Sequence, residues 1–142
     1  MKKLFLIITL FGTSLFSANE GKAQTVRQLN FGIIGINYEI PITSEISVAP
    51  AAATDFELNY LKLGVRANYY FDSLIGLPDE WDVYGGANGG FGIGLRGKGN
   101  DISLGLHAGG RWRWSDKWAV YAELGGGNLG GAAGGVGLTM AL

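Results

Sequence analysis

Residues 58–71 read Leu-Asn-Tyr-Leu-Lys-Leu-Gly-Val-Arg-Ala-Asn-Tyr-Tyr-Phe, and apolar and polar side chains alternate along them. One parity carries Leu61, Leu63, Val65, Ala67, Tyr69 and Phe71. The opposite parity carries Tyr60, Lys62, Arg66, Asn68 and Tyr70. A period of two residues is that of a β-strand, whose successive side chains point to opposite faces of the sheet. The stretch therefore predicts a strand with one apolar and one polar face.

The same alternation recurs in three further stretches, 31–42, 102–114 and 118–124. Their apolar parity includes Ile34, Ile36, Tyr38, Ile40, Ile42, Leu104, Leu106, Trp112, Trp114, Val120 and Leu124. Their polar parity includes Asn37, Glu39, Ser103, His107, Arg111, Arg113, Tyr121 and Glu123. We therefore expect an all-β chain.

An internal repeat indicates how these strands are connected. Residues 78–86 align with residues 115–123, and residues 43–49 match less closely. Each copy begins at a turn and opens a strand, so the repeating unit is an antiparallel hairpin. A series of such hairpins predicts an up-and-down meander.

Length and composition restrict the classes of protein. The chain has 142 residues, one His, no Cys and a formal net charge of −1. This length allows one domain, and the absence of Cys excludes disulfides, thiolate metal sites and cysteine nucleophiles. A nearly neutral charge argues against nucleic acid as a partner.

The first 23 residues predict a cleaved signal peptide. Lys2 and Lys3 precede an apolar run over 4–15, and Ala23 supplies a small residue at the expected cleavage site. The alternative is an uncleaved N-terminal anchor. We expect an exported protein whose mature domain covers residues 24–142.

Two sets of residues favour a membrane barrel, with apolar side chains outside, over a water-soluble one. An interfacial aromatic girdle is expected from Tyr69, Phe71, Trp81, Trp112, Trp114 and Trp118, which lie at strand ends beside turns. A polar network inside the barrel, in its lumen, is expected from Glu39, Arg66, Asp82, His107, Arg111, Arg113 and Glu123. The stretch 24–142 also has the length that eight transmembrane strands and short turns need. The prediction is a transmembrane up-and-down antiparallel β-barrel of about eight strands.

Two alternatives remain open at this point. The charged lumen set either pairs and plugs the barrel, which the narrow interior of eight strands favours, or lines a narrow pathway for ions or small solutes. An exported soluble, lipocalin-like barrel that binds an apolar ligand would instead place its leucines inside and its arginines outside.

No catalytic set is found, so we expect neither an enzyme nor a cofactor or metal. Residues 92–97 match a G-x-G-x-x-G pattern, but a strand rather than a helix follows. Ser103 and His107 share a face at about 13 Å, which is too far for a nucleophile and its base. A lipid-modifying outer-membrane enzyme would need residues that the sequence does not supply.

Glycine is concentrated in the C-terminal part of the chain, including the runs at 125–127, 130–131 and 134–135. Glycine lets a sheet bend sharply and leaves space in a narrow barrel. We expect a mobile exposed loop near residues 127–131 and a final strand over 132–142.

The segments 38–45, 58–63 and 66–71, with the Ala23-Gln24 junction, resemble the small outer-membrane β-barrel proteins common in Bacteroidetes, a porin-like family with an OmpA/OmpX-like barrel domain. The resemblance implies an outer-membrane location, with outer-membrane lipids and the barrel assembly machinery as partners. It also implies a periplasmic C-terminus, with turns 43–45, 72–80 and 115–117 periplasmic and loops 54–57, 96–100 and 125–131 outward. Seven strands are clear, and an eighth must come from residues 24–30 or be absent.

Overall fold

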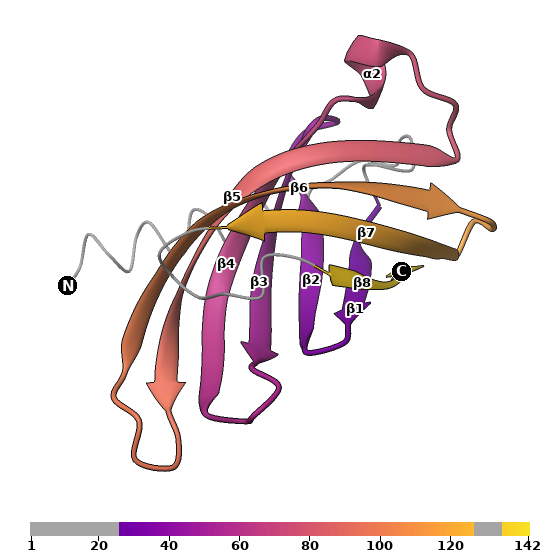
Figure 1. Cartoon of the computed structure of the whole chain (residues 1–142). Coiled ribbons are helices and arrows are strands. Elements are labelled where there is room, and N and C mark those ends of the chain that lie inside the picture. The colour runs from indigo at the N-terminus through magenta and orange to yellow at the C-terminus, as the bar shows by residue number, and fades with distance from the viewer. Residues whose placement is uncertain (1–25, 127–134) are drawn as a thin grey trace.

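The computed structural model describes residues 26–126 and 135–142, in which eight strands close into a barrel (Figure 1). Every neighbouring pair is antiparallel, and the order around the barrel is the order along the chain. The strands are β1 (Gln28–Gly32), β2 (Gly35–Pro41), β3 (Ile46–Thr54), β4 (Tyr60–Tyr70), β5 (Trp81–Gly94), β6 (Asp101–Arg113), β7 (Trp118–Gly126) and β8 (Gly135–Ala141). A short helix, α2 (Asp72–Ile75), lies between β4 and β5. The predicted up-and-down antiparallel barrel of eight strands is confirmed.

Strand β1 closes the barrel. It pairs with β2 on one side and with β8 on the other, from Gln28 opposite Ala141 to Gly32 opposite Gly137. The eighth strand that the sequence left open is therefore the short N-terminal piece. Closure matters because an unpaired sheet edge leaves backbone N–H and C=O groups without partners.

The prediction of one strand over 31–42 is wrong. Phe31 pairs with Ile36 across a turn at residues 33–34, so the stretch is a hairpin rather than a single strand. Neither Ile33 nor Ile34 is a residue that favours tight turns, which is why this turn was not recognised. The parity of the apolar residues does change there, from odd at Phe31 to even at Ile36.

The side chains are distributed in the reverse of a soluble protein. Arg111 is 2% exposed at the centre of the interior, whereas Leu104 on β6 faces outward and is 63% exposed.

 Leu104 follows the buried Ser103 directly, so the two side chains point to opposite faces of β6. The interior is accordingly polar, and the outer wall is apolar.

The outer wall consists of large apolar side chains along the strands. Among them are Phe31, Ile36, Leu61, Leu63, Val65, Phe91, Ile102, Leu104, Leu106, Val120, Leu124, Val136 and Leu138, each more than a third exposed. They alternate with inward polar residues, as a strand with two different faces requires. The apolar core of a soluble domain is replaced here by a polar one.

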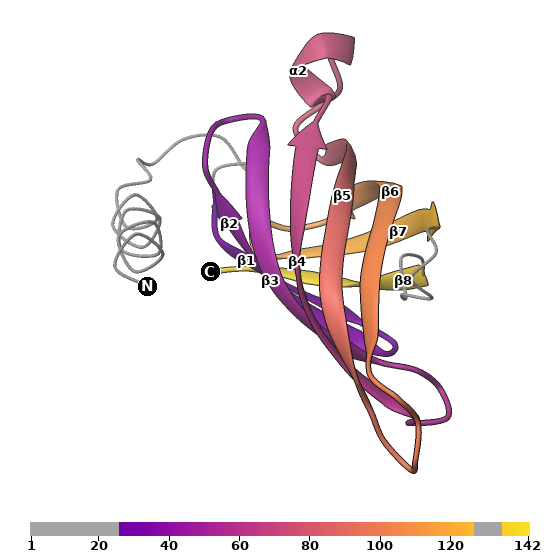
Figure 2. The same ribbon diagram turned by 90° about the vertical axis from the view of Figure 1, so that its left-hand side faces the viewer.

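The wall of the barrel has unequal height. Strands β4, β5 and β6 have 11, 14 and 13 residues, whereas β1, β2 and β8 have 5, 7 and 7. The hairpin of β5 and β6 therefore extends well beyond the turn between β1 and β2 (Figure 2). Helix α2 projects from the opposite end (Figure 2).

The loops fall into two groups, as the expected meander requires. Residues 42–45, 71–80 and 114–117 connect strands at the end that carries α2, and residues 33–34, 55–59 and 95–100 connect them at the other end. The expected signal peptide over 1–23, the expected mobile loop near 127–131 and the first residues of the expected final strand, 132–134, lie outside the described residues.

Candidate functional site in the barrel interior

Near the α2 end, buried arginines connect several strands across the interior of the barrel. Arg111 on β6 forms ion pairs with Glu39 on β2 at 3.1 Å and with Asp82 on β5 at 3.2 Å. Arg113 pairs with the same oxygen of Asp82 at 3.0 Å and donates a hydrogen bond to Gln28 on β1 at 2.9 Å. Both arginines are therefore held by groups on other strands.

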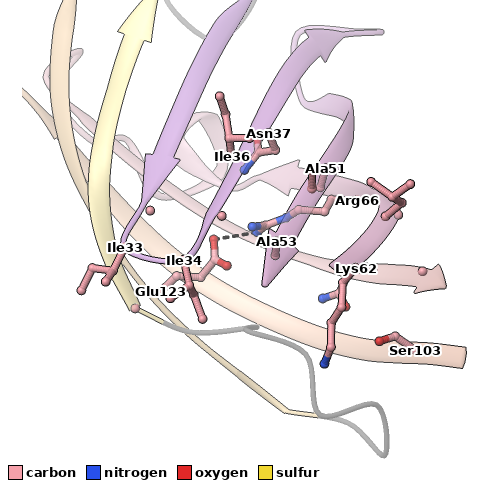
Figure 3. Close-up of a pocket in the computed structure, with 18 of the residues that line it drawn as sticks. Ile33, Ile34, Ile36, Asn37, Ala51, Ala53, Lys62, Arg66, Ser103 and Glu123 are labelled. Carbon is pink, nitrogen blue, oxygen red and sulfur yellow. Dashed lines mark hydrogen bonds and ion pairs between the residues drawn. The ribbon is translucent and has the colours of Figure 1, made fainter. Parts of the chain in front are cut away.

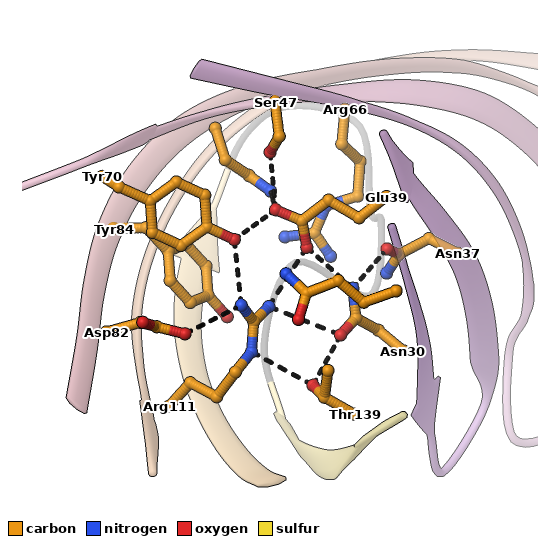
Figure 4. A network of polar contacts seen from close by, with 12 residues as sticks. Asn30, Asn37, Glu39, Ser47, Arg66, Tyr70, Asp82, Tyr84, Arg111 and Thr139 are labelled. Carbon is orange, nitrogen blue, oxygen red and sulfur yellow. Dashed lines mark hydrogen bonds and ion pairs between the residues drawn. The ribbon is translucent and has the colours of Figure 1, made fainter. Parts of the chain in front are cut away.

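Arg111 lies at the centre of this arrangement (Figure 4). It donates hydrogen bonds to the hydroxyl groups of Tyr70 at 3.0 Å and Thr139 at 3.1 Å. A longer contact of 3.4 Å reaches the side-chain oxygen of Asn30. The guanidinium thus connects β1, β4 and β8 in addition to its two ion-pair partners.

Glu39 is the main acceptor opposite Arg111. Its Oε1 accepts hydrogen bonds from Ser47 at 2.5 Å, from Asn68 at 3.3 Å and from the hydroxyl of Tyr70. Its Oε2 accepts from Asn30 at 3.0 Å and from Arg111. A buried carboxylate needs such partners, because an unpaired charge in a low-dielectric interior is strongly unfavourable. We call these residues the Arg111 network: Gln28, Asn30, Glu39, Ser47, Asn68, Tyr70, Asp82, Arg111, Arg113 and Thr139.

A second set lies farther from α2. Arg66 on β4 pairs with Glu123 on β7 at 2.7 Å, and the hydroxyl of Tyr84 donates to the same carboxylate oxygen at 2.8 Å. We call these three residues the Arg66 cluster. His107 lies beside Tyr84, with ring centroids 6.4 Å apart.

The two ring nitrogens of His107 both contact amides, Asn68 at 2.6 Å and Asn88 at 3.0 Å. Asn68 also donates to Glu39, so it links His107 to the Arg111 network. Because both nitrogens are engaged, His107 has none left to activate Ser103. Ser103 and His107 share the inward face of β6, as their spacing predicts.

Little space remains between the two sets. The gap among Asn37, Glu39, Arg66 and Arg111 is too small for a water molecule. Within the described residues, three buried polar atoms lack a hydrogen-bond partner: Arg66 Nε, Asp82 Oδ1 and Arg113 Nε. The side chains themselves therefore fill the barrel at this level, as the width of an eight-stranded barrel allows.

A cavity of about 190 Å³ lies beyond the Arg66 cluster, toward the end opposite α2 (Figure 3). It exists because inward-facing positions there carry small residues. Gly64 on β4 pairs with Gly90 on β5, and Ala51 and Ala53 on β3 lie beside them. Lys62, Arg66 and Glu123 are the charged residues among those described that line it.

All seven residues expected in the lumen network project into the interior, but they do not form one set. Glu39, Asp82, Arg111 and Arg113 belong to the Arg111 network, whereas Arg66 and Glu123 form a separate pair. His107 is held by amides rather than by charges. Sequence reasoning did not identify Gln28, Asn30, Tyr70, Tyr84 and Thr139 as members, although Tyr70 does lie on the polar parity of its strand.

The six expected girdle residues gather at the α2 end of the barrel. Tyr69 contacts Phe71 with ring centroids 5.0 Å apart, and Trp112 contacts both Trp81 and Trp114 at 6.4 Å. Five of the six are at least 37% exposed, and Trp118, the first residue of β7, is half-buried. The group borders loops 71–80 and 114–117.

Other kinds of site are not found in the described part of the chain. No three His, Cys, Asp or Glu side chains there are grouped as metal ligands. No helix in residues 26–126 and 135–142 combines the length and apolar character needed to span a bilayer.

Fold and interior together define a closed β-barrel with a polar interior and an apolar outer wall. Among solved structures, a chain described as "De novo design of transmembrane beta-barrels" is similar to this one, with a TM-score of 0.57 and 15% sequence identity. The match covers 87% of this chain and 98% of that chain. No family model and no curated protein matches the sequence.

Proposed function

We propose that the protein is an integral outer-membrane β-barrel with a structural or porin-like role and a lumen plugged by its own side chains. The observation that carries this proposal is the reversed distribution of side chains. Arg111 is 2% exposed and Leu106 is 69% exposed. Water would not favour this arrangement, but a hydrocarbon environment would.

The exposed apolar wall supports insertion into a membrane. Soluble monomers rarely expose continuous apolar surfaces of this kind. The soluble, lipocalin-like alternative needs leucines inside and arginines outside, which is the opposite of what is observed. Closure through β1 and β8 satisfies the further requirement that no strand edge faces lipid.

The aromatic residues at the α2 end support one membrane boundary there. Trp and Tyr side chains favour the level of the lipid headgroups, because their rings combine apolar surface with a polar group. With a periplasmic C-terminus, α2 and loops 42–45, 71–80 and 114–117 face the periplasm. Outer-membrane lipids and the barrel assembly machinery are then the partners, and neither an enzymatic activity nor a cofactor is part of the proposal.

The paired charges in the interior support a plug rather than an open pore. The Arg111 network joins strands on opposite sides of the barrel, and the gap beside it cannot hold a water molecule. An ion crossing the barrel would have to break several charge-assisted hydrogen bonds. We therefore expect no steady conductance from the wild-type protein.

Membrane fractionation of the expressed full chain tests this proposal. We expect the protein in the outer-membrane fraction, with a gel mobility that changes on boiling, and no steady current in planar bilayers. Soluble periplasmic protein would contradict membrane insertion. A steady current from the wild-type barrel would instead contradict the plug alone.

A further inference from the structure

The cavity beyond the Arg66 cluster combines features that a plugged barrel does not need. Its volume of about 190 Å³ is about six times the share of one water molecule in the liquid. Well-packed interiors rarely leave spaces of this size, so the small residues at 51, 53, 64 and 90 maintain a void that larger side chains would fill. This space is large enough for a small organic molecule.

Arg66 presents unused hydrogen-bond donors at the floor of the cavity. A guanidinium has five N–H donors, and Arg66 makes one hydrogen bond within the described residues, from Nη2 to Glu123 at 2.7 Å (Figure 3). Nη1 has no hydrogen-bond partner among the described residues, and it is not fully buried. Because Arg66 lines the cavity, this nitrogen is available to an acceptor that enters it.

Asn37 adds a second donor close to Arg66. Its Oδ1 accepts a hydrogen bond from Asn30 at 2.8 Å, which leaves the Nδ2 hydrogens for another acceptor. Asn37 lies opposite Ala51 on β3, whose small side chain leaves the donor open to the cavity. Two convergent donors of this kind suit an oxygen anion better than a neutral group.

The charged residues that line the cavity also favour an anion. Lys62 and Arg66 are cationic, and Glu123 is the single anionic residue among the described residues that line the cavity. Cationic residues therefore outnumber anionic ones in this lining, which favours an anionic ligand over a cationic one.

The rim of the cavity is apolar. Ile33 is 71% exposed and Phe56 is 79% exposed, and Ile34 completes the turn between β1 and β2. An inorganic anion would make no use of this rim, and a purely apolar molecule would leave the donors of Arg66 and Asn37 without partners.

We infer that the cavity binds a small monocarboxylate with an aliphatic chain, a binding activity separate from the structural role proposed above. The carboxylate accepts hydrogen bonds from Arg66 and Asn37, and Lys62 strengthens the positive potential. The aliphatic chain extends toward Ile33, Ile34 and Phe56. The site lies inside the barrel, so its test needs no bilayer and can fail or succeed independently of membrane insertion.

Hexanoate labelled with ¹³C in the carboxyl group is the probe. It is titrated by NMR against the full chain folded in a neutral detergent, with empty micelles as the reference. We expect saturable binding that hexan-1-ol displaces at least about tenfold less effectively, because the alcohol lacks the charge that Arg66 recognises. Absence of saturable binding, or equal competition by the alcohol, would overturn the inference.

Two variants examine the cavity without removing the Arg66 pair. Ala51→Leu fills the space and is expected to weaken hexanoate binding about tenfold or more, since the ligand and the new side chain cannot share it. Lys62→Gln removes one charge and is expected to weaken binding about three- to tenfold. Lys98→Gln, in the exposed loop over 95–100, is the matched control and is expected to change binding less than about twofold. Unchanged binding to folded Ala51→Leu protein would place hexanoate outside the cavity.

Discussion

Arg111 and Glu39 are 72 residues apart in the sequence, and their side chains meet at 3.1 Å inside the barrel. They lie on β6 and β2, which are separated by four positions in a ring of eight strands. The pair therefore connects opposite walls. Each hydrogen-bonded ladder joins only neighbouring strands, so this contact fixes the cross-section in a way that the sheet alone does not.

Replacing Arg111 should strongly destabilise the barrel. Arg111→Met leaves the buried carboxylate of Glu39 without its cation and leaves Asp82 with Arg113 alone, and the expected cost is about 3–5 kcal/mol of unfolding free energy. Urea unfolding of the folded protein in lipid vesicles measures it. Lys117→Met, in an exposed turn, is the control and should change little. The double variant Arg111→Met, Glu39→Gln should recover part of the loss, and purely additive effects would contradict the pairing.

A charge placed on the outer wall should be costly only in a membrane. Leu106, near the middle of β6, and Leu74 in α2 are both 69% exposed. In vesicles, Leu106→Arg should cost about 2–4 kcal/mol, because an arginine at the middle of a bilayer loses its hydration. Leu74→Arg lies outside the strands and should cost less than about 0.5 kcal/mol. Equal unfolding free energies for the two variants would argue against lipid contact at Leu106.

Tryptophan fluorescence should report a single membrane level. The chain has four Trp, and Trp81, Trp112, Trp114 and Trp118 all lie in or beside strand ends at the α2 end of the barrel. Lipids brominated near the headgroups should therefore quench the emission more than lipids brominated near the chain ends. Trp112→Phe should reduce the signal without changing this order. Stronger quenching by the deep bromines would contradict an interfacial girdle.

A methyl group at position 86 should disrupt the wall between β4 and β5. A Cβ added to Gly86 would collide with the carbonyl oxygen of Ala67 and lie 2.9 Å from His107 Nε2. Gly86→Ala should therefore cost about 1–3 kcal/mol through overpacking. Gly99→Ala is the matched control, because a Cβ there meets nothing within 4 Å. Thermal or urea unfolding compares the two, and similar losses would show that the effect is not steric.

The stability of the loop over 55–59 should depend on pH through the ionisation of Asp55. Desolvation raises the pKa of this carboxyl, but hydrogen bonds from the backbone of Tyr60 and Asn59 and from the Asn59 side chain outweigh it, so the pKa lies below its ordinary value. Because the pKa is lowered in the folded loop, the stabilisation is present above the ordinary pKa and is lost as pH falls through the lowered one.

Hydrogen exchange at the backbone amides of residues 59 and 60 measures this effect. Asp55→Ala should accelerate exchange at neutral pH, and its difference from wild type should diminish in acid. Asp116→Ala, in an exposed turn, should leave both amides unchanged. Equal protection in the Asp55 variant at neutral pH would show that the carboxylate does not hold the loop.

The alternation of side chains was sufficient to predict the polar face of β4, β6 and β7, where it is regular along the sequence. Ser103 and Leu104 illustrate this, since their neighbouring positions settle that one is inside and the other outside. Alternation does not give the position of a residue along the barrel axis. The sequence could therefore place Arg111 and Arg66 in the interior. It could not show that Arg111 pairs with Glu39 and that Arg66 pairs with Glu123.

Two further features could not be predicted from the sequence pattern, one because it depends on strand register and the other because of the residues in a turn. The cavity requires Gly64 to lie opposite Gly90, and this follows only from the pairing of β4 with β5. The turn at residues 33–34 was missed because two β-branched residues occupy it, where turn prediction looks for Gly, Asn or Asp.

The unequal height of the wall has a consequence for the surrounding lipid. A transmembrane strand needs about 9–11 residues to cross the hydrocarbon layer, which β5 and β6 exceed and β1 and β8 do not reach. In the membrane that we propose for this protein, we expect the bilayer beside β1 and β8 to become thinner, or the barrel to tilt, to match these short strands. If the bilayer adapts by thinning, we expect it to be thinnest next to the seam where β1 pairs with β8.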